Sequence, residues 1–355
     1  MSIRWGIVGC GKVCEVKSGP AFQKAEGSEL VAVMRRDVEQ ARDFARRHGV
    51  PTVHATAEAL ISDPNVDAVY IATPPGSHCE LALQVAAAGK PAYVEKPMAR
   101  NHAECTRMVE AFARARQPLF VAYYRRALPR FLKVKEVLAS GVLGTLRSVD
   151  VRYTSNGQSR LDRTNLPWRV CAEQSGGGLF LDLASHTLDV LDFLLGPLES
   201  VRGDAWNVSR TSLVEDRVSL EFVTPSGAKG AGLWDFTSSA YEDRIVFNGA
   251  LGTLTLSTFG DGPIQLSARA GTETWSLPNP PHIQQPLVQS IVDALVGRGA
   301  CSSSGESAAR TSLVMDRALA GYYGSREDEF WATPSRWSER RGSGQVPDFK
   351  TDSSG

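Results

Sequence analysis

The chain has 355 residues, and its 39 lysines and arginines balance its 39 aspartates and glutamates, so the formal net charge is zero. This length predicts two domains, and the charge balance leaves no basic excess for binding nucleic acid or an anionic membrane. The six cysteines show neither a CxxC pair nor zinc-ligand spacing, so we expect no metal site and a reducing compartment. No apolar run approaches a membrane span, and residues 1–6 lead into a strand pattern without a signal peptide, which predicts a cytoplasmic protein.

A glycine motif follows the first predicted strand. Residues 3–8 form a short apolar run of the kind that makes a fully buried strand. The residues that follow, and that we predict to contact a dinucleotide, are Gly9, Cys10, Gly11, Lys12 and Val13. Glycines at the first and third positions allow a tight turn and let the backbone approach a pyrophosphate at a helix start. Cys14 stands where Gly or Ala is usual, so we expect the first helix to lie slightly further from the strand.

The end of the second predicted strand, residues 30–34, carries two arginines where NAD-binding proteins normally place an acidic residue. The guanidinium groups of Arg35 and Arg36 suit the 2′-phosphate of NADP in charge and in planar geometry. Asp37 is expected to cap the helix over residues 38–48. The pair therefore favours NADP, with NAD still possible; the alternative is that both arginines are ordinary surface charge.

Further strands alternate with helices as far as residue 122. Strands are predicted at 67–72, 92–95 and 119–122, and a helix at 77–88, which indicates a mostly parallel, doubly wound sheet. Between the first of these strands and its helix, Thr73 and Pro74 predict a turn over the cofactor edge. His78 follows at the helix start and is predicted with Thr73 and Pro74 to lie at the cofactor, although a histidine there is more often a satisfied structural residue than a catalyst.

The stretch 92–97 reads Ala-Tyr-Val-Glu-Lys-Pro and predicts a buried strand that stops at a proline. Pro97 has no N–H for a strand ladder. Glu95 and Lys96 therefore fall at the carboxyl end of the strand, where open α/β sheets bind ligands. A lysine in this place is a candidate acid or base. The alternative is a Glu–Lys pair in a surface loop.

A glycine run at residues 176–178 opens a second candidate stretch. Asp182 and His186 are four residues apart, so on a helix they share one face, where a carboxylate and an imidazole can bind a polyol and move a proton. The alternative is a polar stripe that faces solvent. Asp189 and Asp192 are expected off the site or at the domain surface.

The predicted secondary structure of the second half of the chain changes along its length. A helix at 131–140 and a strand at 146–153 precede a polar loop at 156–174, and residues 200–274 alternate as an open antiparallel sheet does. Trp234 and Phe236 mark a candidate oligomer surface on that sheet. Helices are predicted at 286–296 and 305–322, followed from residue 325 by a polar tail that is expected to fray at its end.

Three motifs, taken in order, resemble those of the Gfo/Idh/MocA oxidoreductase family. They are Gly9-Cys10-Gly11, Thr73-Pro74 with His78, and Glu95-Lys96-Pro97. Residues 176–186 are similar to the family's G-G-G-x-x-x-D-x-x-x-H signature, and residues 123–126 resemble its Tyr-Asn-Arg stretch, with Tyr124 where Asn is usual. The resemblance covers about residues 1–324.

The resemblance implies a Rossmann domain followed by an α/β domain with a large open, mostly antiparallel sheet. The expected boundaries are 1–122 for the cofactor domain, 123–324 for the substrate and oligomerisation domain, with helices that return to the first domain, and 325–355 for the tail. Members associate through the open sheet, which implies a homodimer or homotetramer. Trp168 and Arg169 are implied to approach the cofactor, and His282 resembles an aromatic residue near it.

The implied reaction is hydride transfer between NADP(H) and a carbonyl or secondary alcohol of a sugar, polyol or related diol. Lys96, Asp182 and His186 would be its catalytic residues. Two other functions stay open: an NAD-dependent glycosidase of the same superfamily, and a non-enzymatic protein that senses the cofactor. Arg35, Arg36 and the missing export signal speak against the glycosidase, and the three retained catalytic residues speak against the sensor.

Overall fold

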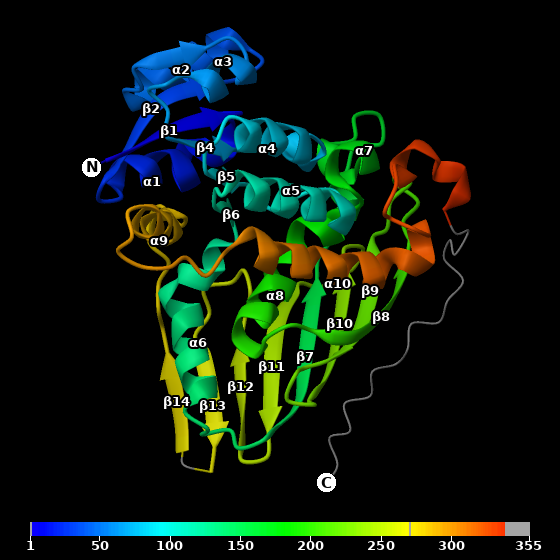
Figure 1. The fold of residues 1–355 in the computed structure, drawn as a ribbon. Helices are drawn as coiled ribbons and strands as arrows, with labels where there is room; N and C mark the ends of the chain where they lie inside the picture. The colour runs from blue at the N-terminus through cyan, green and yellow to red at the C-terminus, as the bar shows by residue number, and fades with distance from the viewer. Residues whose placement is uncertain (1, 270, 338–355) are drawn as a thin grey trace.

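The computed structural model describes residues 2–269 and 271–337, which form two sheets joined by helices (Figure 1). The first sheet has six parallel strands in the order β3-β2-β1-β4-β5-β6, and its strand order reverses between β1 and β4. The strands are β1 (Ile3–Val8), β2 (Ser28–Met34), β3 (Thr52–His54), β4 (Ala68–Ile71), β5 (Ala92–Val94) and β6 (Leu119–Val121). The predicted doubly wound parallel sheet is therefore confirmed.

Both faces of this sheet are buried, because alternate residues of its strands enter different cores. Trp5 of β1 packs on Phe22 with ring centroids 4.8 Å apart, whereas Val8, three positions further along the strand and on its opposite face, joins the core beneath α4 and α5. The helices around the sheet are α1 (Gly19–Lys24), α2 (Val38–His48), α3 (Ala57–Ser62), α4 (His78–Ala87) and α5 (His102–Ala115). Burial on both faces explains why these strands read as continuous apolar runs.

The second sheet has eight strands in the order β14-β13-β12-β11-β7-β10-β9-β8. Its strands are β7 (Leu146–Thr154), β8 (Glu199–Trp206), β9 (Arg217–Val223), β10 (Lys229–Asp235), β11 (Glu242–Gly249), β12 (Gly252–Leu256), β13 (Ile264–Ala268) and β14 (Gly271–Trp275). The β7–β10 pair is parallel and the other neighbouring pairs are antiparallel, so the predicted mostly antiparallel sheet is confirmed.

Helices cover one face of the second sheet (Figure 1). The remaining helices are α6 (Pro129–Ala139), α7 (Ala172–Ser175), α8 (Leu179–Leu195), α9 (Gln285–Leu295) and α10 (Gly305–Tyr323). The last two return to the first sheet, because α9 contacts α1 and α10 contacts α5. Across the described residues, none of the helices combines the length and apolar composition that a membrane crossing needs.

Trp234 and Phe236 do not lie on the open face of the second sheet, contrary to the expectation from sequence. Both are fully buried, and the Trp234 ring meets Phe180 of α8 at 5.2 Å between centroids. The two aromatic residues are two positions apart on an extended segment, so they point to the same, helix-covered side. The opposite side presents residues such as Asp150, Arg152 and Arg244 around a hollow of about 230 Å³.

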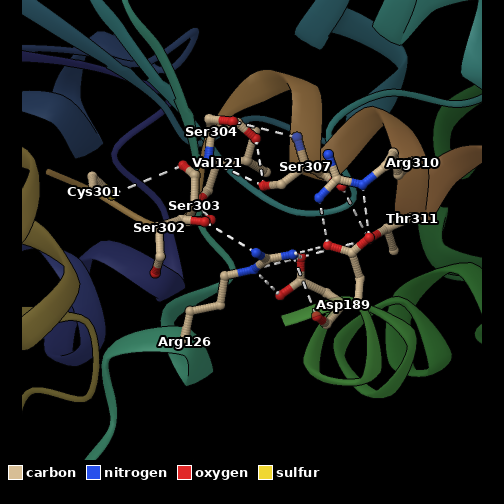
Figure 2. Close-up of polar contacts among 11 residues, drawn as sticks. Val121, Arg126, Asp189, Cys301, Ser302, Ser303, Ser304, Ser307, Arg310 and Thr311 are labelled. Atoms are coloured by element: carbon tan, nitrogen blue, oxygen red, sulfur yellow. Dashed lines mark hydrogen bonds and ion pairs between the residues drawn. The ribbon is translucent and has the colours of Figure 1, made fainter. Parts of the chain in front are cut away.

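Asp189 and Asp192 lie off the cleft described below, but they are not at the surface. Figure 2 shows Arg126 directed at the carboxylate of Asp189, with Arg310 and Thr311 of α10 alongside. The Arg126 guanidinium donates to Asp189 at 2.7 to 3.0 Å and to Asp192 at 2.9 Å, and Arg310 donates to Asp192 at 2.8 Å. Burial raises the pKa of Asp189 to about 6, although the Arg126 charge opposes the rise. These ion pairs tie α8 to α10 and to the turn after β6.

The described part of the predicted polar tail, residues 325–337, packs against the rest of the fold. Arg326, Phe330 and Trp337 are all more than nine-tenths buried, and the segment includes short helical turns at Phe330–Ala332 and Pro334–Arg336. The indole of Trp337 packs against Tyr323 at 4.8 Å between centroids. Three aromatic residues within this polar stretch supply the apolar surface that holds it down. The rest of the predicted tail, 338–355, lies outside the described residues.

Candidate active site

A cleft of about 1220 Å³ opens where the strand order of the first sheet reverses, which is the place where open α/β sheets bind ligands. Its walls come from the carboxyl ends of β1, β2, β4 and β5, from the loop before α8, and from α8 itself. The cleft collects most of the predicted site residues. They are Gly9, Gly11, Lys12, Val13, Arg35, Arg36, Thr73, Pro74, Glu95, Lys96, Trp168, Arg169, Asp182 and His186.

The glycine motif forms one end of the cleft. Gly9 has a φ of 90°, and a Cβ added there would lie 2.8 Å from the Thr73 side chain, so the position suits glycine alone. Cys10 is fully buried and is not among the lining residues, but its carbonyl oxygen accepts a hydrogen bond from Arg35 at 3.5 Å. Cys14 is also fully buried, and the chain passes through a wider π-helical turn, Cys14–Ser18, before α1 begins.

Arg35 and Arg36 line the cleft beside the glycine motif, at the end of β2. Asp37 caps α2 as expected, because its carboxylate accepts a hydrogen bond from the Gln40 backbone at 3.1 Å. The acidic side chain near this strand end is therefore engaged with the helix. The end of β2 presents guanidinium groups to the cleft.

His78 occupies a structural position. The ring is fully buried and is not among the lining residues, with Nε2 at 2.7 Å from the Thr73 carbonyl oxygen and Nδ1 at 3.1 Å from that of Pro97. It thus ties the Thr73 turn to the turn after Lys96. His282 likewise lies off the cleft, with its Nδ1 at 2.8 Å from the Val16 carbonyl oxygen.

Glu95 is held by residues from distant parts of the chain. Its Oε1 accepts hydrogen bonds from the Tyr70 hydroxyl at 2.6 Å and from Gln284 Nε2 at 2.7 Å, while the Tyr93 hydroxyl donates to Gln284 at 2.8 Å. Gln284 is fully buried and lines the cleft just before α9. This network fixes the end of β5, and therefore the starting point of Lys96.

An ion pair joins Lys96 to Asp182 across the cleft. Lys96 Nζ donates to Asp182 Oδ1 at 2.6 Å and to the Asp182 carbonyl oxygen at 2.9 Å, and Arg169 Nε donates to Oδ2 at 3.1 Å. Burial by itself would raise the pKa of Asp182, but the charges and hydrogen bonds of Lys96 and Arg169 outweigh burial and lower it. The carboxylate is therefore ionised and holds the lysine in one place. Trp168 stacks beneath Arg169, with 4.3 Å from the guanidinium carbon to the ring centroid.

His186 lies one helical turn beyond Asp182 on α8, among the rings of Tyr123, Tyr124 and Phe259. Burial lowers its pKa well below the ordinary value, and the nearby charges of Arg125, Lys96 and Lys17 lower it further. The imidazole is therefore neutral near pH 7, so one ring nitrogen can donate and the other can accept. Its Nδ1 is buried without a hydrogen-bond partner among the described residues.

The start of α8 is fixed by the glycine run and by a buried carboxylate. Gly178 N–H donates to both oxygens of Glu215 at 2.9 and 3.0 Å, and the Tyr323 hydroxyl donates to the same group. Burial raises the pKa of Glu215 to about 7. Gly176 has a φ of 84°, and a Cβ there would collide with the Arg100 carbonyl oxygen, so glycine is required where the two loops touch.

Arg326 fastens the same two loops together. Its guanidinium donates to the Gly176 carbonyl oxygen at 2.9 Å, to that of Arg100 at 2.8 Å, and to Asp316 at 2.7 Å. Arg100 closes the stretch that carries Lys96, and Gly176 opens the stretch that carries Asp182. The first part of the predicted polar tail therefore supports the two loops that lead to the Lys96–Asp182 pair.

Sequence reasoning missed several residues of the cleft. Lys17, Arg125, Phe259 and Gln284 all line it. Arg125 lies inside the stretch 123–126 that resembles a family motif, and this position could have identified it as a cleft residue. The others stand in segments without a motif, and their place depends on the way α9 and the second sheet return to the first.

Comparisons with known proteins agree with this architecture. Residues 3–123 match the family profile described as "Oxidoreductase family, NAD-binding Rossmann fold", and residues 131–255 match the GFO/IDH/MocA C-terminal domain. "Oxidoreductase P35" of Formosa agariphila is 39% identical over 315 residues, which are 88% of this chain and 97% of that protein. The trans-1,2-dihydrobenzene-1,2-diol dehydrogenase of Sus scrofa is 31% identical over 283 residues, covering 79% of this chain and 82% of that enzyme.

Among solved structures, aldose-aldose oxidoreductase from Caulobacter crescentus, complexed with glycerol, superposes with a TM-score of 0.78. The alignment covers 90% of this chain and 98% of that one at 21% identity, so it shows a shared fold. Both family profiles match this chain, and the 39% identical relative aligns with 88% of it, so family membership follows from sequence as well as from fold. This chain belongs to the GFO/IDH/MocA family of oxidoreductases and is an NAD(P)-dependent dehydrogenase that acts on CH–OH groups.

Proposed function

We propose that this protein moves a hydride between the nicotinamide ring of NADP(H) and a carbonyl or secondary-alcohol carbon of a sugar, polyol or related diol. The observation that carries the proposal is the Lys96–Asp182 ion pair, with 2.6 Å between Nζ and Oδ1, in the same cleft as the glycine motif. A cationic donor fixed in a half-enclosed cleft is what an alcohol or carbonyl oxygen needs as its charge changes.

The chain's residues fit a dinucleotide. Gly11 leaves the backbone open, since an added Cβ would have no neighbour closer than 3.8 Å, and a pyrophosphate can approach the residues that follow, Lys12 and Val13, just before the first helical turn. When bound, the nicotinamide supplies the hydride chemistry, and the protein supplies position and charge. We propose residues 1–122 as the cofactor domain and residues 123–324 as the substrate and oligomerisation domain.

Each catalytic side chain has a distinct task in this proposal. Lys96 Nζ donates a hydrogen bond to the reacting oxygen and exchanges a proton with it. Asp182 fixes Lys96 and accepts from a substrate hydroxyl. His186 is neutral, so it can pass the proton onward or bind a second hydroxyl. Trp168 and Arg169 close the cleft over the cofactor side and restrain Asp182 from its other oxygen.

The cofactor preference rests on Arg35 and Arg36, which line the cleft while Asp37 is occupied as a helix cap. Arg35→Asp should weaken NADP binding by about 1.5 to 3 kcal/mol for each charge-assisted hydrogen bond lost. Fluorescence titration with NADPH and NADH measures the change. Arg42→Asp, at an exposed position on α2, is the matched control and should keep the preference. Equal affinity of the wild-type protein for both cofactors at moderate salt would show that the proposed preference is wrong.

We also propose that the open face of the second sheet, around Asp150, Arg152 and Val246, is buried in a homodimer or homotetramer. The support is a broad sheet face that helices leave uncovered, because closed symmetric assemblies bury such faces. Sedimentation equilibrium should therefore show a dimer or tetramer. A monomer across a wide concentration range would remove this proposal.

A substrate panel followed at the nicotinamide absorbance band, with NADP and NAD each supplied, tests the reaction itself. Net formation or consumption of reduced cofactor with a sugar or polyol supports the proposal. Cofactor that stays bound through turnover with no net absorbance change would instead point to the glycosidase. Cofactor binding with no turnover of any kind would point to a sensor.

A further inference from the structure

Arg125 is the most unusual charged residue of the cleft. It is 5% exposed yet lines the cleft next to His186, and its Nη1 is buried without a hydrogen-bond partner among the described residues. Such a group costs free energy unless something pairs with it. Neither the glycine motif nor the Lys96–Asp182 pair makes use of this side chain.

The guanidinium of Arg125 is held rigidly in place. Its Nε donates to the Thr258 carbonyl oxygen at 2.9 Å, and its central carbon lies 5.0 Å from the Tyr124 ring centroid and 4.6 Å from that of Phe259. Stacking against two rings and one backbone bond fix the plane of the group. The remaining nitrogens form a planar fork of the kind that binds carboxylates with two parallel hydrogen bonds.

The charges around His186 also favour an anionic ligand. Lys17, Lys96 and Arg125 all line the cleft, and the charges of all three act on His186. Asp182 already pairs with Lys96 and Arg169, and Glu95 is held by Tyr70 and Gln284. Among residues 2–269 and 271–337, no ion pair joins Lys17 or Arg125 to a carboxylate. An oxidised nicotinamide would add a further positive charge.

From this geometry we infer that the substrate carries a carboxylate, which binds the fork of Arg125 beside His186 while its hydroxyl-bearing carbon faces Lys96. The substrate class is then a sugar acid or hydroxy acid, in preference to a neutral sugar. The inference rests on the proposed function, because it places the carboxylate relative to the proposed reacting carbon. Lys17 lies near enough to His186 to add long-range attraction for the same group.

Binding of two matched probes tests this inference without any need for turnover. L-Tartrate and L-threitol share a four-carbon skeleton and differ in their terminal carboxylates. Each is titrated calorimetrically into the protein saturated with oxidised cofactor. Tartrate should bind about 10- to 100-fold more tightly than threitol, the worth of one charge-assisted hydrogen bond. Arg125→Gln should abolish this preference, and Arg202→Gln, an exposed arginine on β8, should keep it.

Several outcomes would overturn the inference. They are equal or tighter binding of threitol, a preference that survives Arg125→Gln, or no detectable binding of tartrate. Tighter binding of glycerol 3-phosphate than of tartrate would also overturn it, since the cleft would then select a phosphate. Cofactor titration is read first on the same samples, so a protein that binds no nicotinamide cofactor would count against the proposed function and not against the role of Arg125.

Discussion

Lys96→Met should lower turnover by about 10² to 10⁴-fold, the usual contribution of a positioned acid or base. Methionine keeps the length of the stem and removes the charged group that lies 2.6 Å from Asp182 Oδ1. Folding should survive, because Asp182 keeps its ion pair with Arg169. Cofactor affinity should change little, since the glycine motif and the arginines of β2 are untouched. Turnover on any active substrate, paired with cofactor titration, measures both effects.

Two comparison variants test whether the loss of turnover is specific to Lys96. Lys24→Met, at an exposed position at the end of α1, should leave turnover unchanged. His186→Ala should lose less than Lys96→Met if Lys96 can exchange its proton with water directly. A Lys96→Met protein that binds cofactor normally and works at close to the wild-type rate would show that another residue carries the proton.

Arg126→Met should destabilise the fold by about 3 to 5 kcal/mol, because it leaves two buried carboxylates without their shared cation. Asp189 and Asp192 are both more than nine-tenths buried, and Arg126 donates to each of them. Denaturant unfolding measures the loss. Arg310→Gln should cost much less, since that side chain is 43% exposed. Adding Asp189→Asn to Arg126→Met should restore part of the stability; a single variant as stable as wild type would contradict the assignment.

The free energy of unfolding of Arg126→Met should also depend on pH. Burial already raises the pKa of Asp189 to about 6, and loss of the Arg126 charge should raise it further. The folded variant then holds a proton that the unfolded chain releases near pH 4. Its free energy of unfolding should therefore fall as pH rises from about 4 to beyond 6, and the difference from wild type should be larger at pH 8 than at pH 5.

Sequence patterns located the strands and the three residues Lys96, Asp182 and His186 that the cleft brings together, since a strand that stops at Pro97 and a spacing of four between Asp182 and His186 are local signals. The burial of Asp189 and Asp192 could not be predicted in this way. Their partners Arg126 and Arg310 lie 63 to 118 positions away in the chain, and a run of aspartates on a helix has the same pattern as a solvent-facing stripe.

The prediction of which face of the second sheet carries Trp234 and Phe236 was wrong for a related reason. Trp234 and Phe236 showed that one side of β10 is aromatic, but alternation alone does not say which side the helices cover. The burial of Arg326 had no sequence signal at all, because a charged residue in a polar stretch favours solvent. Its carbonyl partners, Arg100 and Gly176, are backbone groups that any residue type could supply.

Arg326 is synthesised after every other residue that holds the reacting pair in place. The loops at Arg100 and Gly176, beside Lys96 and Asp182, are therefore synthesised early and joined by Arg326 late, when α10 and the segment after it have left the ribosome. A chain that stops at residue 324 should form both sheets and bind cofactor, yet turn over slowly. Restored turnover in a chain that ends at residue 337 would show that catalytic competence depends on residues 325–337.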